Sequence, residues 1–151
     1  MANQPFKFDL DHAFGYLVYQ ASGFIRDYLD REFTRKGYPI AVEEFTALIY
    51  IWDKDGQPHR ALAKRLHRNK TYVTRLVSKI ESLGFIERLP GKKDGREKRL
   101  FLTRKGKQLM AEVTQLVAKA MKFASKGVDA REMSICKNVL RKVIQNFSIG
   151  P

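Results

Sequence analysis

Two segments of the sequence carry side chains whose chemistry suits contact with a nucleic acid. The first spans residues 69–79, where polar residues are expected to face away from an apolar stripe at helical spacing. Arginine and lysine can donate hydrogen bonds to guanine edges, threonine can contact a thymine methyl group or a phosphate, and tyrosine can contact either. The residues that we predict to contact DNA from this segment are Asn69, Lys70, Thr71, Tyr72, Thr74, Arg75 and Lys79.

The second segment is a short, glycine-containing loop that enters an extended run. It is dense in cations, which we expect to reach the DNA backbone or a narrow minor groove. These cations are Lys92, Lys93, Arg96, Lys98 and Arg99. The basic residues that follow at 104, 105 and 107 suit a solvated face as well as they suit phosphate contact.

The positive charge of the chain is concentrated in one part of it. The 151 residues carry a formal net charge of +13. Residues 58–107 contain 16 Lys or Arg and 4 Asp or Glu, a net charge of +12, whereas the other 101 residues contain 13 and 12. A single strongly basic segment favours a polyanionic partner. The alternative interpretation is a charged face that is merely solvated.

Hydrophobic periodicity and turn residues predict the elements that position these side chains. Apolar residues at three- and four-residue steps indicate helices, and two short runs around a polar loop indicate a hairpin. Asn69 and Thr103 are expected to cap helices, Gly84 to end one, and Asp129 with Glu132 to form a capping box. The predicted helices cover 9–33, 43–52, a short segment after Pro58, 70–83, a segment after Thr103 and a last one after Asp129; the strands cover 85–89 and 98–102.

This order predicts a mainly α (α+β) fold in which two short helices, a tight turn and a hairpin form a winged helix-turn-helix lobe. In such a lobe the second helix lies in the major groove of DNA. We interpret residues 1–151 as one domain, with a DNA-binding lobe at 40–102. The first and last helices, at 8–36 and 103–147, carry apolar stripes that so small a domain cannot wholly cover, which predicts a dimer.

Several of these segments resemble the MarR family. The resemblance covers about residues 42–107 and rests on Leu62-Ala63-Lys64-Arg65-Leu66, on the run from Lys70 to Arg88 and on Asp94-Gly95-Arg96 followed by Leu102-Thr103 and Gly106. It implies a homodimer that joins through the first and last two helices and binds a pseudo-palindromic operator. It also implies that Arg96 enters the minor groove and that Asp94 orients the loop through Arg75 or Arg96.

We therefore expect a sequence-specific double-stranded DNA-binding transcriptional regulator. We further expect it to be a repressor modulated by a small lipophilic or aromatic ligand. The alternative is an architectural DNA- or RNA-binding protein without sequence choice. A ligand pocket between the dimerisation helices and the DNA-binding lobe would use aromatic and basic residues, which could equally be core residues: Tyr16, Tyr19, Arg26, Phe45 and Trp52.

Other classes of protein find little support. The sequence lacks a glycine-rich phosphate loop, paired carboxylates and a nucleophile with a nearby base, so we expect neither an enzyme nor a cofactor. The three histidines have no ligand spacing, which argues against a metal site, and Cys136 is expected to be a buried packing residue. No signal peptide or membrane-spanning segment is evident, and we expect a cytoplasmic protein that does not bind membranes.

Overall fold

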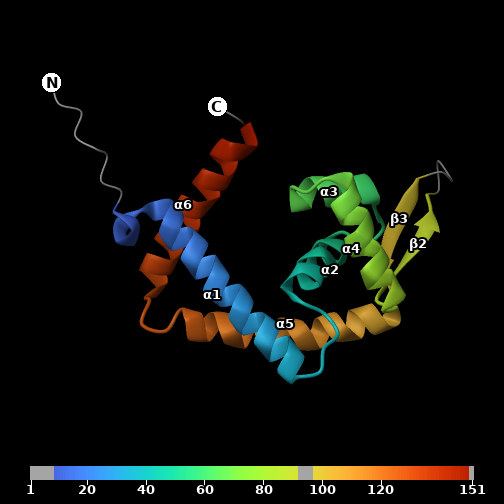
Figure 1. Ribbon diagram of the computed structural model, residues 1–151, viewed down its shortest axis with the longest axis horizontal. Coiled ribbons are helices and arrows are strands. Elements are labelled where there is room, and N and C mark those ends of the chain that lie inside the picture. The colour runs from blue at the N-terminus through green and yellow to red at the C-terminus, as the bar shows by residue number, and fades with distance from the viewer. Residues whose placement is uncertain (1–8, 92–96, 150–151) are drawn as a thin grey trace. The chain divides into compact units, whose positions relative to one another are not determined.

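The computed structural model describes residues 9–91 and 97–149, which form helices and one small sheet (Figure 1). The chain divides into two compact units, Met1–Val117 and Ala118–Pro151, and the division falls inside helix α5 (Arg104–Ala124). Within the described residues, no helix is long and apolar enough to cross a lipid bilayer. The mainly α, winged helix-turn-helix fold class predicted from the sequence is confirmed.

The N-terminal helix has a break that the sequence did not predict. A 3-10 helix, η1 (Leu10–His12), is followed at Ala13 by an extended residue, with ψ of 113°, and then by α1 (Phe14–Arg35). The apolar stripe of α1 is buried only near its C-terminal end, at Leu29 and Phe33. The rest of the stripe is exposed or half-buried in the single chain.

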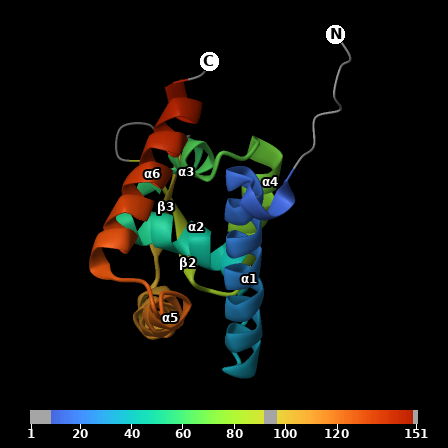
Figure 2. The same cartoon turned by 90° about the vertical axis from the view of Figure 1, so that its left-hand side faces the viewer.

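Helices α2 (Val42–Asp53), α3 (His59–Leu66) and α4 (Lys70–Ser82) pack against one another and contribute about half of the core of the first unit (Figure 2). Each contributes apolar side chains that recur at helical spacing, so that one face of every helix is withdrawn from water. Fully buried side chains in this core are Ala47, Leu48, Ile51, Leu62, Val73, Val77 and Ile80. This packing fixes which face of α4 points outward.

The sheet contains one more strand than the sequence predicted. Strands β2 (Ile86–Pro90) and β3 (Lys98–Leu102) form the expected antiparallel hairpin, in which Ile86 lies opposite Leu102. A two-residue strand, β1 (Gln57–Pro58), pairs with the other edge of β3 and gives the order β1-β3-β2. Two residues are too few to show a hydrophobic alternation, so sequence periodicity could not indicate this strand.

The predicted helix caps of the last two helices are confirmed. The hydroxyl oxygen of Thr103 accepts a hydrogen bond from Gly106 N–H at 3.0 Å at the start of α5. In the second unit, Asp129 and Glu132 cap α6 (Ala130–Ile149) reciprocally, each accepting from the other's backbone N–H at 2.8 and 2.9 Å.

The prediction that Cys136 is buried is wrong for the single chain. Its side chain is exposed on α6. Ile135 and Val139 on the same helix are also exposed, by 54% and 43%. The apolar pattern around Cys136 therefore describes an uncovered surface of α6, and periodicity cannot distinguish such a surface from a core face.

Candidate nucleic-acid interface

Helix α4 is held so that one of its faces is presented to solvent. It begins at a tight turn in which His67 adopts the left-handed conformation, with φ of 49°, and Asn69 caps it by accepting a hydrogen bond from Tyr72 N–H at 2.8 Å. Its inner face consists of Val73, Leu76, Val77 and Ile80, each of which is at most 5% exposed. The cap predicted at Asn69 is confirmed, and Asn69 therefore has a structural task.

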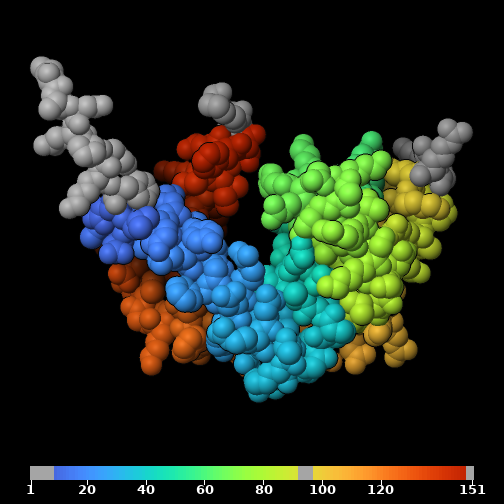
Figure 3. Space-filling model, viewed as in Figure 1, coloured from blue at the N-terminus to red at the C-terminus, as the bar shows by residue number. Residues whose placement is uncertain are grey.

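The outer face of α4 carries donors of the kinds that contact bases and phosphates. Lys70, Thr71, Thr74 and Arg75 are all exposed, as the sequence predicted. In the space-filling view, α4 lies at the surface of the first unit (Figure 3). Because the opposite face is packed into the core, these four side chains share one direction.

Three residues predicted to contact DNA have partners within the lobe. The ammonium of Lys79 lies 2.7 Å from the carboxylate of Glu44, which belongs to α2. The ring of Tyr72 is covered by the guanidinium of Arg68, which lies 5.4 Å from the ring centroid. Arg99 donates to the carbonyl oxygen of Gly56 at 3.0 Å, which ties the first half of β3 to the turn before β1.

The hairpin is joined to α4 by a residue that sequence reasoning did not single out. Arg88 of β2 donates to the hydroxyl of Ser78 at 2.6 Å and forms an ion pair of 3.1 Å with Glu81. These contacts tie the strand to the C-terminal half of α4. In the sequence, the only signal for a role of Arg88 is its position in a basic hairpin, because the residues that it contacts belong to another element.

The loop residues Lys92, Lys93, Asp94 and Arg96 lie outside the described residues.

A groove of about 560 Å³ opens between α3, α4 and the hairpin. Its lining includes four cationic side chains, one hydroxyl and one carboxylate: Arg60, Lys70, Arg88 and Lys98, with Thr74 and Glu97. His59 also lines it. Burial, together with the nearby Arg88 and Lys70, lowers the pKa of His59 below its ordinary value of 6.5. The groove thus combines positive charge with donors, the chemistry that accommodates phosphate oxygens.

The five residues suggested for a ligand pocket lie in different places. Arg26 lines a pocket of about 450 Å³, together with residues of α2 and α4, whereas Trp52 lines another one. Phe45 is 7% exposed and packs edge-on against Phe33, so it belongs to the core. Tyr19 is 72% exposed on α1, and Tyr16 contacts Gln20. Aromatic type does not distinguish these environments, which are set by packing.

Comparison with known proteins supports the interpretation of this lobe. The MarR family model matches residues 40–98. The chain is 26% identical over 104 residues to the uncharacterized HTH-type transcriptional regulator YybA of Bacillus subtilis (strain 168), covering 69% of each chain.

Two solved structures have similar folds. The structure of transcriptional regulator PA3341 is 27% identical, with a TM-score of 0.80, and the match covers 91% of this chain and 100% of that one. A cysteine-to-serine mutant of MarR from E. coli, solved with operator DNA, is 25% identical with a TM-score of 0.78, covering 85% and 91%. The family match thus falls on the lobe that contains α2, α3, α4 and the hairpin. Residues 40–98 of this chain match the MarR family, and the chain shares its fold with solved transcriptional regulators.

Proposed function

We propose that this chain is a sequence-specific regulator that binds double-stranded DNA and represses transcription. The observation that carries the proposal is the outer face of α4, where Thr71, Thr74 and Arg75 are exposed on a helix whose opposite face is buried. An α-helix fits the major groove of B-DNA, where every base pair presents a distinct pattern of donors and acceptors. Arg75 is the residue best suited to donate to a guanine edge.

We assign phosphate binding to the groove beside α4 and base contacts to the outer face of α4. Arg60 and Lys98 are exposed at this groove, and Lys70 stands at the first turn of α4. Contacts from such cations to phosphates set orientation on the duplex without reading sequence. The loop residues Lys92, Lys93, Asp94 and Arg96 are assigned to this interface from the sequence alone.

We propose that the regulator acts as a homodimer on a pseudo-palindromic operator. Large apolar side chains are exposed on α1, including Phe14, Leu17 and Phe24. In the second unit, Ile144 and Phe147 of α6 are 61% and 84% exposed. Apolar surface of this extent favours association, and a two-fold dimer presents two α4 helices to successive turns of one groove.

We propose that a small aromatic or lipophilic ligand regulates binding through the pocket that Arg26 lines. Its walls include Leu66, Arg68, Tyr72 and Leu76, which supply apolar area, an aromatic ring and cationic charge. Tyr72 and Leu76 belong to α4, so a ligand there would contact the helix that we assign to base reading. Of the residues first suggested for a pocket, the proposal retains Arg26.

A binding selection tests the proposal. The purified full-length protein is incubated with a randomised duplex library, and the recovered duplex is compared with a scrambled duplex of the same length and composition at several salt concentrations. We expect the selected duplex to bind about 10³-fold more tightly or better. Equal affinity for all duplexes, or a preference for RNA, would instead support an architectural or RNA-binding protein. A reporter gene placed behind the selected site distinguishes repression from activation.

A further inference from the structure

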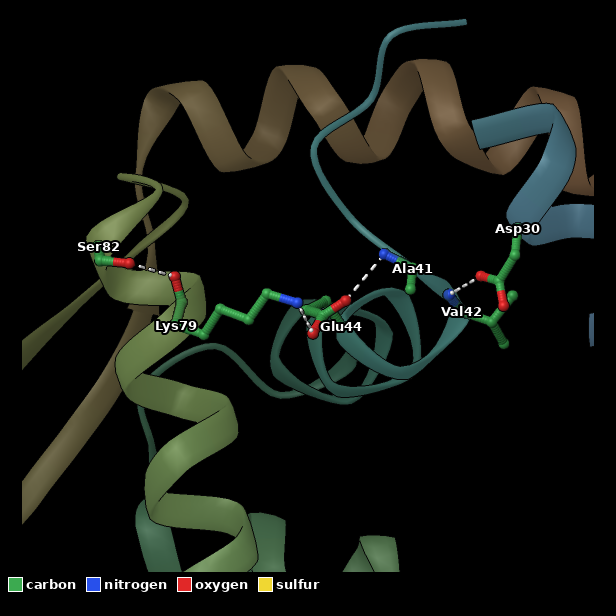
Figure 4. Close-up of polar contacts among 6 residues, drawn as sticks. All are labelled: Asp30, Ala41, Val42, Glu44, Lys79 and Ser82. Atoms are coloured by element: carbon green, nitrogen blue, oxygen red, sulfur yellow. Dashed lines mark hydrogen bonds and ion pairs between the residues drawn. The ribbon is translucent and has the colours of Figure 1, made fainter. Parts of the chain in front are cut away.

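A buried carboxylate connects the start of α2 to the C-terminal half of α4 (Figure 4). Glu44 is 1% exposed. One of its carboxylate oxygens accepts a hydrogen bond from the backbone N–H of Ala41 at 2.8 Å, and the other lies 2.7 Å from the Nζ of Lys79. Both oxygens of this buried group are therefore occupied, one by the helix to which Glu44 belongs and one by α4.

The start of α2 is also fixed from α1. The carboxylate of Asp30 accepts a hydrogen bond from the backbone N–H of Val42 at 2.7 Å, next to the N–H that Glu44 holds. At the other end, the hydroxyl of Ser82 donates to the carbonyl oxygen of Lys79 at 2.7 Å. Figure 4 shows these polar contacts as a series that runs from α1 across the start of α2 to α4.

The contact between Lys79 and Glu44 restrains the rotation of α4 about its axis more closely than apolar packing does. The buried residues Val73, Val77 and Ile80 hold α4 to the lobe and set which of its faces is buried, but the attraction of apolar surfaces has no preferred direction and defines the exact rotation of the helix less closely. A charge-assisted hydrogen bond is directional. Lys79 lies four residues after Arg75, and residues four apart share one face of a helix. Holding Lys79 at Glu44 therefore limits rotation of α4 about its axis and fixes the direction of Arg75.

We propose that Glu44 is a positioning residue for base reading, acting on Arg75 through Lys79. The inference rests on the DNA-binding function proposed above. It reassigns Lys79 from a DNA contact to an anchor of α4. Glu44 itself is buried, so it affects DNA only through the placement of α4.

The substitution Glu44→Gln tests the proposal because two explanations predict opposite signs. Ala41 and Lys79 donate to different carboxylate oxygens, and in glutamine one of these two positions becomes an NH2 group, so one of the two donors faces another donor. Removing a negative charge strengthens binding to any DNA if only electrostatics matter. Loss of positioning weakens binding to the selected duplex by about tenfold or more and leaves the scrambled duplex unweakened. Glu43→Gln is the matched control, because Glu43 is the exposed neighbour of the same charge.

A second variant keeps the test decisive if Glu44→Gln does not fold. Lys79→Met retains the aliphatic length of an exposed side chain. If Lys79 is an anchor, this variant loses affinity mainly for the selected duplex and its salt dependence stays unchanged. If Lys79 is a phosphate contact, both duplexes lose affinity alike and the salt slope falls by about one, which would overturn the proposal.

The double variant completes the cycle. We expect the double variant Glu44→Gln/Lys79→Met to lose no more affinity for the selected duplex than the single variant with the larger loss, because both changes remove the same contact. Additive losses would contradict the proposal. A wild-type protein that does not discriminate between the duplexes refutes the proposed function itself. A discriminating wild type with a Glu44→Gln variant that behaves like Glu43→Gln refutes only the positioning role.

Discussion

The carboxylate of Asp55 accepts a hydrogen bond from the backbone N–H of Leu102 at 2.9 Å, joining two points of the chain 47 residues apart. Asp55 lies in the turn between α2 and β1, and Leu102 is the last residue of β3. The same carboxylate lies 3.6 Å from Lys107 of α5. One side chain thus connects the turn after α2, the base of the hairpin and the start of α5.

We expect Asp55→Ala to lower the free energy of unfolding by about 1–3 kcal/mol, because the N–H of Leu102 loses its partner in a partly buried position. Urea unfolding at a fixed protein concentration measures the change. Asp53→Ala is the control. Asp53 forms an exposed pair with Arg65, and losing such a pair costs less than about 1 kcal/mol. Equal costs for the two variants would show that the Leu102 contact is unimportant.

Because Gly106 has no side chain, the backbone of Phe85 can approach it closely at the start of α5. A Cβ atom at this position would lie 2.0 Å from the carbonyl oxygen of Phe85, which is backbone and cannot rotate away. We expect Gly106→Ala to destabilise the protein by about 1–3 kcal/mol or more, measured by thermal unfolding. Gly15→Ala is the comparison, since nothing lies within 4 Å of its added Cβ. A Gly106→Ala variant as stable as the wild type would refute the close approach.

Stability is expected to depend on pH through His59. Its pKa in the folded state is lowered by burial, by Arg88 and by Lys70. The unfolded chain therefore takes up a proton near pH 6.5 that the folded chain does not bind until the pH is lower, so stability falls as the pH drops below about 6.5. Other charged groups that line the same groove are Arg60, Glu97 and Lys98.

We expect His59→Gln to reduce this acid-side loss of stability, measured as unfolding free energy between neutral pH and about pH 5. His12→Gln is the control because His12 lies on the exposed η1 segment. The hypothesis fails if the two variants keep the same pH dependence as the wild type.

Arg75→Ala is expected to weaken binding to the selected duplex by about 1–3 kcal/mol and to relax base preference at one position. The physical reason is the loss of paired donors to a base edge. Quantitative binding to duplexes with single base changes measures both effects. Arg31→Ala, on the exposed side of α1, is the control. An equal loss on selected and scrambled DNA would place Arg75 among the phosphate contacts instead.

Arg96→Ala is expected to weaken binding and to reduce the salt dependence of the binding constant by about 0.9 in the log–log slope. This prediction comes from the resemblance of Asp94-Gly95-Arg96 to the hairpin loop of the MarR family, since Arg96 lies outside the described residues. Titration of the duplex at four or more salt concentrations measures the slope. Unchanged affinity would refute a loop contact.

Features that depend on neighbours along the chain could be predicted before the fold was known. Helix caps at Asn69 and Thr103 require a donor and an acceptor three residues apart, so a short stretch of sequence contains both. The apolar stripe of α4 also identified its buried face, and with it the exposed position of Thr74 and Arg75. These local rules were enough to place the helices, the hairpin and the outer face of α4.

Which of the polar residues form contacts inside the protein depends on the packing of the helices. Lys79 and Arg75 are both cationic residues on the polar side of one helix, and nothing in the sequence separates them. Lys79 lies beside Glu44, 35 residues away, because α2 packs against α4. The aromatic residues suggested for a pocket were separated in the same way, with Phe45 in the core and Tyr19 in solvent. Partners of this kind are set by how helices pack, and hydrophobic periodicity carries no information about which charged groups that packing brings together.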